Sequence, residues 1–304
     1  METAITVRGR PLEEILEAHA QWAEGASSGK RCVFQSETLN EAQLRDVNLQ
    51  GAILRGTTLL DADLSGANFS EAIFDTTDFG RTMLTGANLS GAQISESQFV
   101  CSWMAEVMLT EAKVRNSTFR KANLRDAKFQ GAVIESCRFQ GTILNRASMH
   151  HSRIATCDLS ESEFAGAQFF RAQILSCRFY AAKCAEANFS NSRLKSCDFA
   201  KADLSRAKFF QTDFNGSQLD RADLHDADLR QALLNGILLG RANLTGANLQ
   251  GANLFAADFR GADLTRARGL TSQQLCQART DESTILPNGS RGPYRRLSGA
   301  ERLS

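Results

Sequence analysis

The sequence predicts an all-β solenoid, a parallel β-helix with four sides and about 12 coils that has a short helical cap at each end. Three observations predict this fold. A large apolar residue returns at every fifth position from Phe34 to Leu264, and four of the cysteines recur at every twentieth position. No proline occurs between residues 12 and 286. Since proline lacks the N–H group that joins stacked strands, its exclusion favours a long ladder of backbone hydrogen bonds.

The step of five covers 47 consecutive positions without a change of phase. The stepped residue, called the centre below, is Leu, Phe, Ile, Met or Val everywhere except at Cys184. Residues two apart on a strand point the same way, so the centre and the residue two before it are expected inside. The residue between them points outward, and the last two form a corner. The inner residue before the centre is small in most repeats; the exceptions include Glu37, Val47, Val107 and Ile237.

The cysteines indicate how many sides each coil has. Cys137, Cys157, Cys177 and Cys197 each lie two before a centre and follow one another at steps of twenty positions. Twenty positions are four pentapeptides, so each coil has four sides. The four thiols are predicted to form one interior structural column, spaced at about 4.8 Å. A buried thiol there replaces another small group and is shielded from reaction, whereas Cys101, at a corner, is the better candidate for a reactive thiol.

Both ends of the chain are predicted to cap the coils. Residues 1–30 form an N-terminal segment with a helix that starts near Pro11, which suits a first helical turn. Its apolar stripe is expected to cover the first coil and consists of Leu12, Ile15, Leu16, His19 and Trp22.

The repeat region spans residues 31–268, and a C-terminal capping segment spans residues 269–286. In that segment Thr271 can N-cap a short helix from Ser272 to Ala278. Residues 287–304 are polar and glycine-rich, so a mobile tail is expected there.

The repeats resemble the pentapeptide repeat family, whose pattern is roughly A-[D/N]-L-x-x. The pattern is plain in ADLSGANF (62–69), TGANLSGAQI (85–94) and RANLTGANLQGANL (241–254), and the resemblance covers residues 32–266. It implies a right-handed quadrilateral β-helix. Members with known roles include proteins that protect DNA gyrase from inhibitors by resembling duplex DNA, and secreted effectors.

No enzyme signature is present in the sequence. It has no glycine-rich phosphate loop, no G-x-S-x-G and no H-E-x-x-H. His150 and His151 form a pair at a corner, and no cysteine or acidic cluster joins them as further metal ligands. His19 is expected to pack on the cap helix, and His225, which lies among several aspartates, is interpreted as part of a solvated surface. We therefore expect no catalytic residue, no metal site, no cofactor and no small-molecule substrate.

Localisation is predicted from composition. The chain has no run of about 18 apolar residues, so no membrane span is expected. Its start lacks the apolar core of a signal peptide. Eight cysteines without such a signal favour a reducing compartment, and we expect a cytoplasmic protein.

Charge is banded along the repeats although the formal net charge is only +1. Residues 37–111 carry a net charge of −8, residues 112–210 carry +9 and residues 211–264 carry −3. A register of four pentapeptides per coil places the middle cations mainly on two sides. The candidate basic surface consists of Lys113, Arg115, Lys128, Arg153, Arg171, Arg193, Lys195 and Lys208.

Apolar residues at outward or corner positions mark a candidate protein-contact patch, because a contiguous apolar patch on a solenoid often marks a contact site. The alternative is that these residues pack along the coils' own surface. The patch consists of Met83, Val100, Cys101, Trp103, Met108, Phe170 and Phe210.

These features favour a non-enzymatic scaffold that binds a protein partner. The resemblance suggests an alternative, a duplex mimic that binds gyrase or a topoisomerase and confers antibiotic resistance or self-immunity. A duplex has one charge per about 1.7 Å, far denser than the net −2 of the whole repeat region. A secretion-associated adaptor or effector is a further alternative. Nucleic-acid binding by the basic middle is disfavoured, because aromatic residues do not alternate with its arginines.

Overall fold

The computed structural model describes residues 5–296 and 298–302. The chain forms two compact units: unit 1 ends at Ser148 and unit 2 begins at Met149. In each unit successive coils pair in parallel, and each residue faces the one four pentapeptides away. The fold is therefore the parallel β-solenoid that the sequence predicts.

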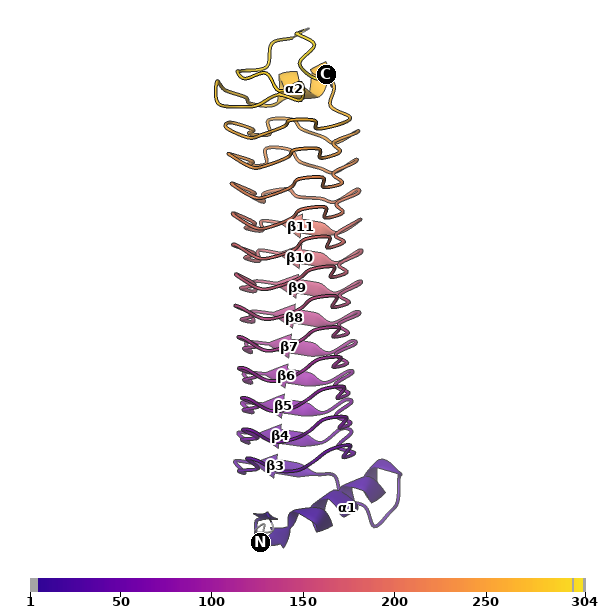
Figure 1. The fold of residues 1–304 in the computed structure, drawn as a ribbon. Coiled ribbons are helices and arrows are strands. Elements are labelled where there is room, and N and C mark those ends of the chain that lie inside the picture. The colour runs from indigo at the N-terminus through magenta and orange to yellow at the C-terminus, as the bar shows by residue number, and fades with distance from the viewer. Residues whose placement is uncertain (1–4, 297, 303–304) are drawn as a thin grey trace. The chain divides into compact units, whose positions relative to one another are not determined.

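Unit 1 has one three-residue strand in each of six coils, always on the same side (Figure 1). Each strand residue faces the one twenty positions later, as Phe34 faces Leu54. The other sides are joined by single β-bridges of the same register, such as that between Thr38 and Thr58. The strands are β3 (Val33–Gln35), β4 (Ile53–Arg55), β5 (Ile73–Asp75), β6 (Gln93–Ser95), β7 (Lys113–Arg115) and β8 (Val133–Glu135).

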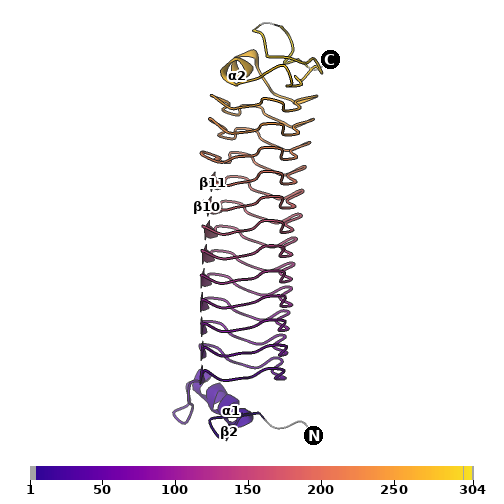
Figure 2. The same cartoon turned by 90° about the vertical axis from the view of Figure 1, so that its left-hand side faces the viewer.

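Unit 2 continues the pattern with β9 (Arg153–Ala155), β10 (Gln173–Leu175) and β11 (Arg193–Lys195), and Figure 2 shows β10 and β11 along one edge of their coils. Beyond β11 the same side is joined by single bridges, which connect Asp213 to Leu233 and Leu233 to Asn253. The sequence predicts about 12 coils, and in the described residues a full strand forms in nine of them.

The centres fill the interior of both units. Every centre from Phe34 to Leu264 is buried. In unit 1, four phenylalanines stack face to face with ring centroids 4.7 to 4.8 Å apart, which is the spacing between paired strands. The register of twenty therefore also aligns the aromatic rings, which are those of Phe79, Phe99, Phe119 and Phe139.

The corners are tight turns. Between Leu64 and Ala67, the Ala67 N–H donates to the Leu64 carbonyl at 3.0 Å, and Gly66 has φ of 70°, as in a type II turn. Glu71 occupies the equivalent corner position with φ of 59° although it has a side chain. Its N–H donates to the Ser90 carbonyl of the next coil at 2.8 Å, and such ladder bonds offset the strain of a left-handed non-glycine residue.

The N-terminal cap is the helix α1 (Leu12–Ala23), which lies beneath β3 in Figure 1. Leu12 and His19 on its stripe are buried. The His19 Nδ1 accepts the Cys32 N–H at 2.9 Å, and its ring stacks on Trp22 at 5.3 Å. Burial lowers the pKa of His19. A short antiparallel hairpin that the sequence did not predict precedes the helix, formed by β1 (Thr6–Val7) and β2 (Arg10–Pro11).

The C-terminal cap contains α2 (Ser272–Gln277), one residue shorter than expected. The Thr271 hydroxyl accepts the Gln274 N–H at 3.2 Å, and the Gln274 carboxamide oxygen accepts the Thr271 N–H at 2.8 Å. This reciprocal pair is a capping box. Leu275 is the residue of α2 that is buried.

The segment after Pro287, expected to be a mobile tail, has defined contacts in its described residues. Gly289, with φ of 83°, closes a turn that lets the chain fold back, and Ile285 then forms an antiparallel bridge with Arg291. The Tyr294 hydroxyl lies 2.7 Å from the Ser272 hydroxyl of α2. The sequence could not show this, because glycine-rich composition predicts flexibility while the turn depends on the cap it folds against. Among the described residues, no helix has the length and apolarity needed to cross a membrane.

Candidate protein-contact surfaces

The outward residue before each centre has a structural role when it is Asn or Asp. Its side-chain oxygen accepts the backbone N–H two residues later: Asp63 accepts that of Ser65 and Asn88 that of Ser90, both at 3.0 Å. Asp203 of unit 2 makes the same contact. Such Asx contacts stabilise the corner that follows. An apolar residue at this position gives up that hydrogen bond.

Met83 and Trp103 occupy this outward position in unit 1. A β-bridge joins them, so they are neighbours in adjacent coils. Trp103 is 58% exposed and Met83 is 41% exposed. An indole and a thioether are thus held in solvent at positions where the fold can gain a hydrogen bond.

Three more predicted contact residues lie around this pair. Val100 is half-buried and Cys101 exposed at the corner that precedes Trp103, and Met108 is half-buried at the outward position of the next side. We define the Trp103 patch by the members of this cluster, which are Met83, Val100, Cys101, Trp103 and Met108.

Phe170 and Phe210, also predicted as contact residues, belong to unit 2 and are half-buried. The guanidinium carbon of Arg171 lies 5.0 Å from the centre of the Phe170 ring, and that of Arg230 lies 5.6 Å from the Phe210 ring. These are cation–π contacts. Each ring already has a partner in its own unit, so the Trp103 patch is defined without them.

Three residues of the candidate basic surface lie in unit 1. The Arg115 Nε is 3.2 Å from a carboxylate oxygen of Glu135 in the next coil. Lys113 and Lys128 are both exposed and form no ion pair within the described part of unit 1. One of these three positive charges is therefore balanced.

The other five lie in unit 2. The Lys195 Nζ is 3.4 Å from Asp213, and Arg171 covers Phe170. Arg193 and Lys208 are exposed without an ion pair among the residues described. Arg153 is exposed on β9. Further cations of this stretch pair with acids one coil away, which weakens the basic field; these pairs are Arg178 with Asp198, Lys183 with Glu163 and Arg206 with Glu186.

The cysteines of the predicted interior column are buried in both units. In unit 1 the Cys137 thiol donates to the Glu135 carbonyl at 3.2 Å. In unit 2 the Cys197 thiol donates to the Ile174 carbonyl at 3.4 Å, and the Cys157 N–H donates to the Cys177 sulfur at 3.4 Å. The cysteine side chains therefore form hydrogen bonds with backbone groups in the interior of the coils.

Serine takes the place of cysteine further along this column. The Ser217 hydroxyl donates to the Leu194 carbonyl, and Cys197 makes the equivalent contact one coil earlier. Burial raises the pKa of Cys197 to about 12, so its thiol stays protonated and able to donate. The hydrogen bond with Cys157, together with burial, also raises the pKa of Cys177.

The histidines outside the cap lie in unit 2 or at its start. His150 and His151 face the Phe170 ring with centroids 6.3 and 6.4 Å away. The His225 Nδ1 lies 3.1 Å from a carboxylate oxygen of Asp223. Within the part of the chain that the structure describes, no three His, Cys, Asp or Glu side chains come together as metal ligands would.

A second apolar surface, which the sequence analysis missed, lies in unit 2. Leu233 and Leu238 are 41% and 43% exposed at outward positions on adjacent sides of one coil, and Phe255 is 63% exposed at the corner between those sides in the next coil. We call these three residues the Leu238 strip. The signal was present in the sequence, because Leu233 and Leu238 stand where Asn or Asp stands in the neighbouring repeats.

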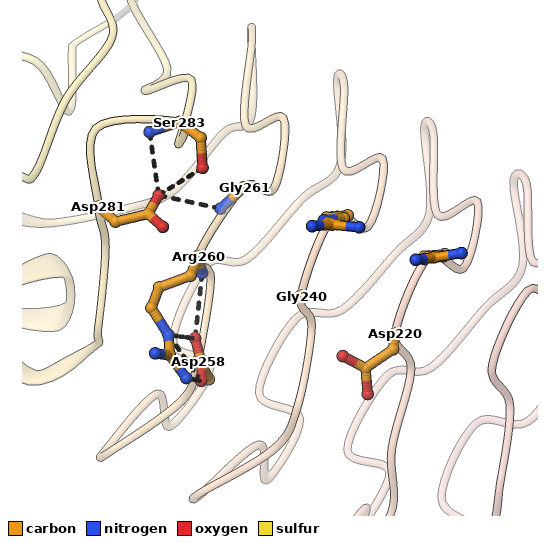
Figure 3. A pocket seen from close by; sticks show the side chains of 9 residues that line it. Asp220, Gly240, Asp258, Arg260, Gly261, Asp281 and Ser283 are labelled. Carbon is orange, nitrogen blue, oxygen red and sulfur yellow. Dashed lines mark hydrogen bonds and ion pairs between the residues drawn. The ribbon is translucent and has the colours of Figure 1, made fainter.

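A notch opens beside this strip, with a volume of about 340 Å³ (Figure 3). Gly240 leaves it free of a side chain, and a Cβ atom there would lie 2.7 Å from the Asp220 carboxylate. We call it the Gly240 notch. It is lined by Asp220, Arg221, Gly240, Arg241, Asp258, Arg260, Gly261, Asp281 and Ser283.

Three of the six charged side chains that line the notch already have a partner in the chain. The Arg260 guanidinium binds the Asp258 carboxylate through two nitrogens at 2.9 and 2.6 Å, as Figure 3 shows. One oxygen of Asp281 accepts the Ser283 hydroxyl at 2.7 Å and the Gly261 N–H at 3.1 Å. Hydrogen bonds, first that from Ser283, lower the pKa of Asp281 to about 2.

The remaining charged side chains of the notch are Asp220, Arg221 and Arg241. They form no ion pair with any other described residue. The notch therefore offers two positive charges and one negative charge to a molecule outside the chain.

The repeat pattern matches two family models. One, described as a pentapeptide repeat region, matches residues 72–149 and 167–244, which is more than half of the chain. The other, described as pentapeptide repeats (8 copies), matches residues 42–81 and 232–268. The chain belongs to the pentapeptide repeat family. No curated protein matches the chain.

Solved structures of other pentapeptide repeat proteins are similar to this one. HetL of the cyanobacterium Nostoc sp., involved in the regulation of heterocyst differentiation, is 26% identical; the match covers 92% of this chain and 98% of HetL, with a TM-score of 0.35. QnrB1, a plasmid-mediated fluoroquinolone resistance protein, is 22% identical over 62% of this chain and 90% of its own, with a TM-score of 0.34. A pentapeptide repeat protein of the Arabidopsis thaliana thylakoid lumen is 19% identical over 48% and 74%, with a TM-score of 0.21.

Proposed function

We propose that this pentapeptide repeat protein is a non-enzymatic scaffold that binds a protein partner through the Trp103 patch. The observation that carries the proposal is the exposure of Trp103 and Met83 at stacked outward positions. In the next coil of unit 1 the same column holds Asn123, which accepts the Arg125 N–H at 3.2 Å. The fold can therefore use asparagine in this column, and the two apolar residues serve something outside the coil.

The energetics of contact surfaces support this use of tryptophan. Tryptophan is enriched among the residues that dominate binding energy, which typically cost about 2 kcal/mol or more when truncated. Methionine suits such surfaces because its side chain is flexible and polarizable. A partner that covers Trp103 and Met83 also removes apolar area from water, which is favourable in itself.

The test uses Trp103→Asn, which replaces the indole with a residue that the same column already holds. Tagged full-length protein is used to capture partners from an extract of the source cell, and retained proteins are identified by mass spectrometry. We expect at least one protein to be retained by the wild type and by the control Gln98→Asn, an outward substitution on another side of unit 1, but lost from Trp103→Asn. If the three baits retain the same proteins, the Trp103 patch is not the contact site.

A second candidate function is duplex mimicry by the acidic stretch of unit 1. Of the 11 acidic side chains in residues 37–111, three pair with an arginine, namely Glu37, Asp61 and Asp63. The other eight carboxylates form no ion pair with a described residue. Of the three arginines in this stretch, Arg55 alone also forms no ion pair with a described residue. Such a local negative field can steer association with a DNA-binding surface.

This second candidate predicts inhibition of gyrase supercoiling, or rescue of supercoiling from a gyrase inhibitor, at micromolar protein. The exposed corner acids Glu71 and Glu111 lie in one column, two coils apart. Replacing both with Gln weakens the field and should reduce the effect, whereas Trp103→Asn should leave it unchanged. If the protein neither inhibits supercoiling nor rescues it from the drug, the candidate is ruled out.

A further inference from the structure

The Leu238 strip and the Gly240 notch lie side by side in unit 2. Leu238 is an outward residue, and Gly240 lies two residues later at the corner that follows, so the apolar side chain and the notch lie within roughly 7 Å of each other. Phe255 belongs to the next coil, as does Asp258, which bridges to Leu238. An apolar area is thus followed directly by an open charged site.

Backbone groups beside Leu238 already pair with the neighbouring coils. The Leu238 carbonyl accepts the Leu219 N–H at 2.7 Å, and the Leu239 N–H donates to the Asp258 carbonyl at 2.9 Å. Because the coils use these groups on each other, a partner cannot pair with them as an added strand. Recognition must come from side chains.

The size of the apolar area indicates what kind of partner it fits. Three partly exposed side chains amount to on the order of 300 Å². A stable complex of two folded proteins buries roughly 800 Å² on each partner. The strip is therefore too small to serve alone as a dimer interface, and it matches one or two side chains of a short segment.

The charges in the notch indicate the polarity of that segment. Arg221 and Arg241 are in adjacent coils at the same corner position, and neither forms an ion pair with another described residue. Two guanidinium groups at one site favour a carboxylate, which arginine can bind through two nitrogens. The Asp220 carboxylate, which forms no ion pair with another described residue, lies next to Gly240 in the notch. It can accept a backbone N–H of the bound segment.

We propose that the Leu238 strip and the Gly240 notch together bind an extended, acidic segment of a partner protein. An apolar side chain of the segment packs on Leu238 and Phe255, and an Asp or Glu two residues further along binds Arg221 and Arg241. In an extended peptide, alternate side chains are also roughly 7 Å apart, which matches the distance between strip and notch. This site is independent of the Trp103 patch.

The experiment selects ligands from a displayed library of random nine-residue peptides on the full chain. We expect enrichment of an apolar residue followed two positions later by Asp or Glu. Selected peptides are then synthesised, and their affinities are measured by fluorescence anisotropy. Leu238→Asn and Arg241→Ala should each weaken binding at least ten-fold, and Trp103→Asn should change it less than two-fold.

Three results would overturn the proposal. The first is a selection that enriches no motif or enriches basic peptides. The second is an unchanged peptide affinity in both Leu238→Asn and Arg241→Ala. The third is a single-stranded oligonucleotide that binds more tightly than the peptides and loses its binding in Arg221→Ala, because this would assign the notch to nucleic acid. Melting temperatures of the variants show whether each one is folded. Because Leu238 and Arg241 are surface residues, either variant alone suffices if the other fails to fold.

Discussion

The inner and outer columns of unit 1 follow different rules although they belong to the same coils. Inside, Phe79, Phe99, Phe119 and Phe139 stack at 4.7 to 4.8 Å and are fully buried. Outside, the column that contains Met83 and Trp103 changes from acid to apolar to amide within a few coils, with Asp63 before the pair and Asn123 after it.

The difference shows that stacking at intervals of twenty residues restricts the type of side chain much more at inner positions than at outer positions. An inner side chain contacts the coils above and below it, so its size is set by its neighbours. An outer side chain faces water, so its exchange changes at most the hydrogen bond that an Asn or Asp makes to the following corner, and it leaves the inner stack in place. Stability is therefore expected to depend on the inner column and partner recognition on the outer one, and three substitutions test this separation.

Phe119→Ala should have the largest effect on stability. It removes the ring at the middle of the inner stack, and large-to-small changes of a buried phenylalanine cost about 3–5 kcal/mol. Urea unfolding followed by circular dichroism measures the loss. Phe119→Leu is the control, since leucine is a common centre, and it should cost less than half as much. A loss below about 1 kcal/mol for Phe119→Ala would contradict the primacy of the inner stack.

Thr82→Val should have an intermediate effect. The buried Thr82 hydroxyl donates to the Leu59 carbonyl at 2.6 Å, and valine keeps the shape while removing the donor. We expect a loss of about 1 kcal/mol in the free energy of unfolding. Thr82→Ser retains the donor and should recover part of it. Equal stabilities of the valine variant and the wild type would show that the inner hydroxyl groups only fill space.

Trp103→Asn should have the smallest effect on stability. The indole is largely exposed, so the change in the free energy of unfolding should stay within about 0.5 kcal/mol. Its direction should be stabilising, because the asparagine oxygen can accept the Ala105 N–H, as Asn123 accepts that of Arg125. A clear drop in the melting temperature would mean that Trp103 packs as part of the coil and would remove the argument for a contact site.

Much of the architecture could be predicted from the sequence because the repeat is strict. Phe34 to Leu264 hold one phase, so inner and outer positions follow from numbering alone. The same numbering places Met83 and Trp103 at outward positions, and it places Leu233 and Leu238 there as well. Phe255 is harder to predict, because corner residues vary widely in type.

Other features could not be predicted from the repeat. The hairpin of β1 and β2 and the contacts of Tyr294 lie outside the repeats, where no periodicity places the residues. The charge bands follow from the sequence alone, but whether a given cation remains free depends on a side chain one coil away, as for Arg115 and Glu135.

The sequence by itself determined the coil of four sides, the content of its interior and the identity of its outward columns. The period of five separates inward from outward positions, and the spacing of twenty between the cysteines sets which residues share a column. The tertiary structure alone decided which outward groups remain available. Arg171 covers Phe170, Arg260 binds Asp258, and Trp103, Arg221 and Arg241 stay free. The physical reason is that an outward side chain is available only if no side chain of a neighbouring coil lies close enough to contact it. The period shows which side chains are neighbours, but it does not give the distances between them.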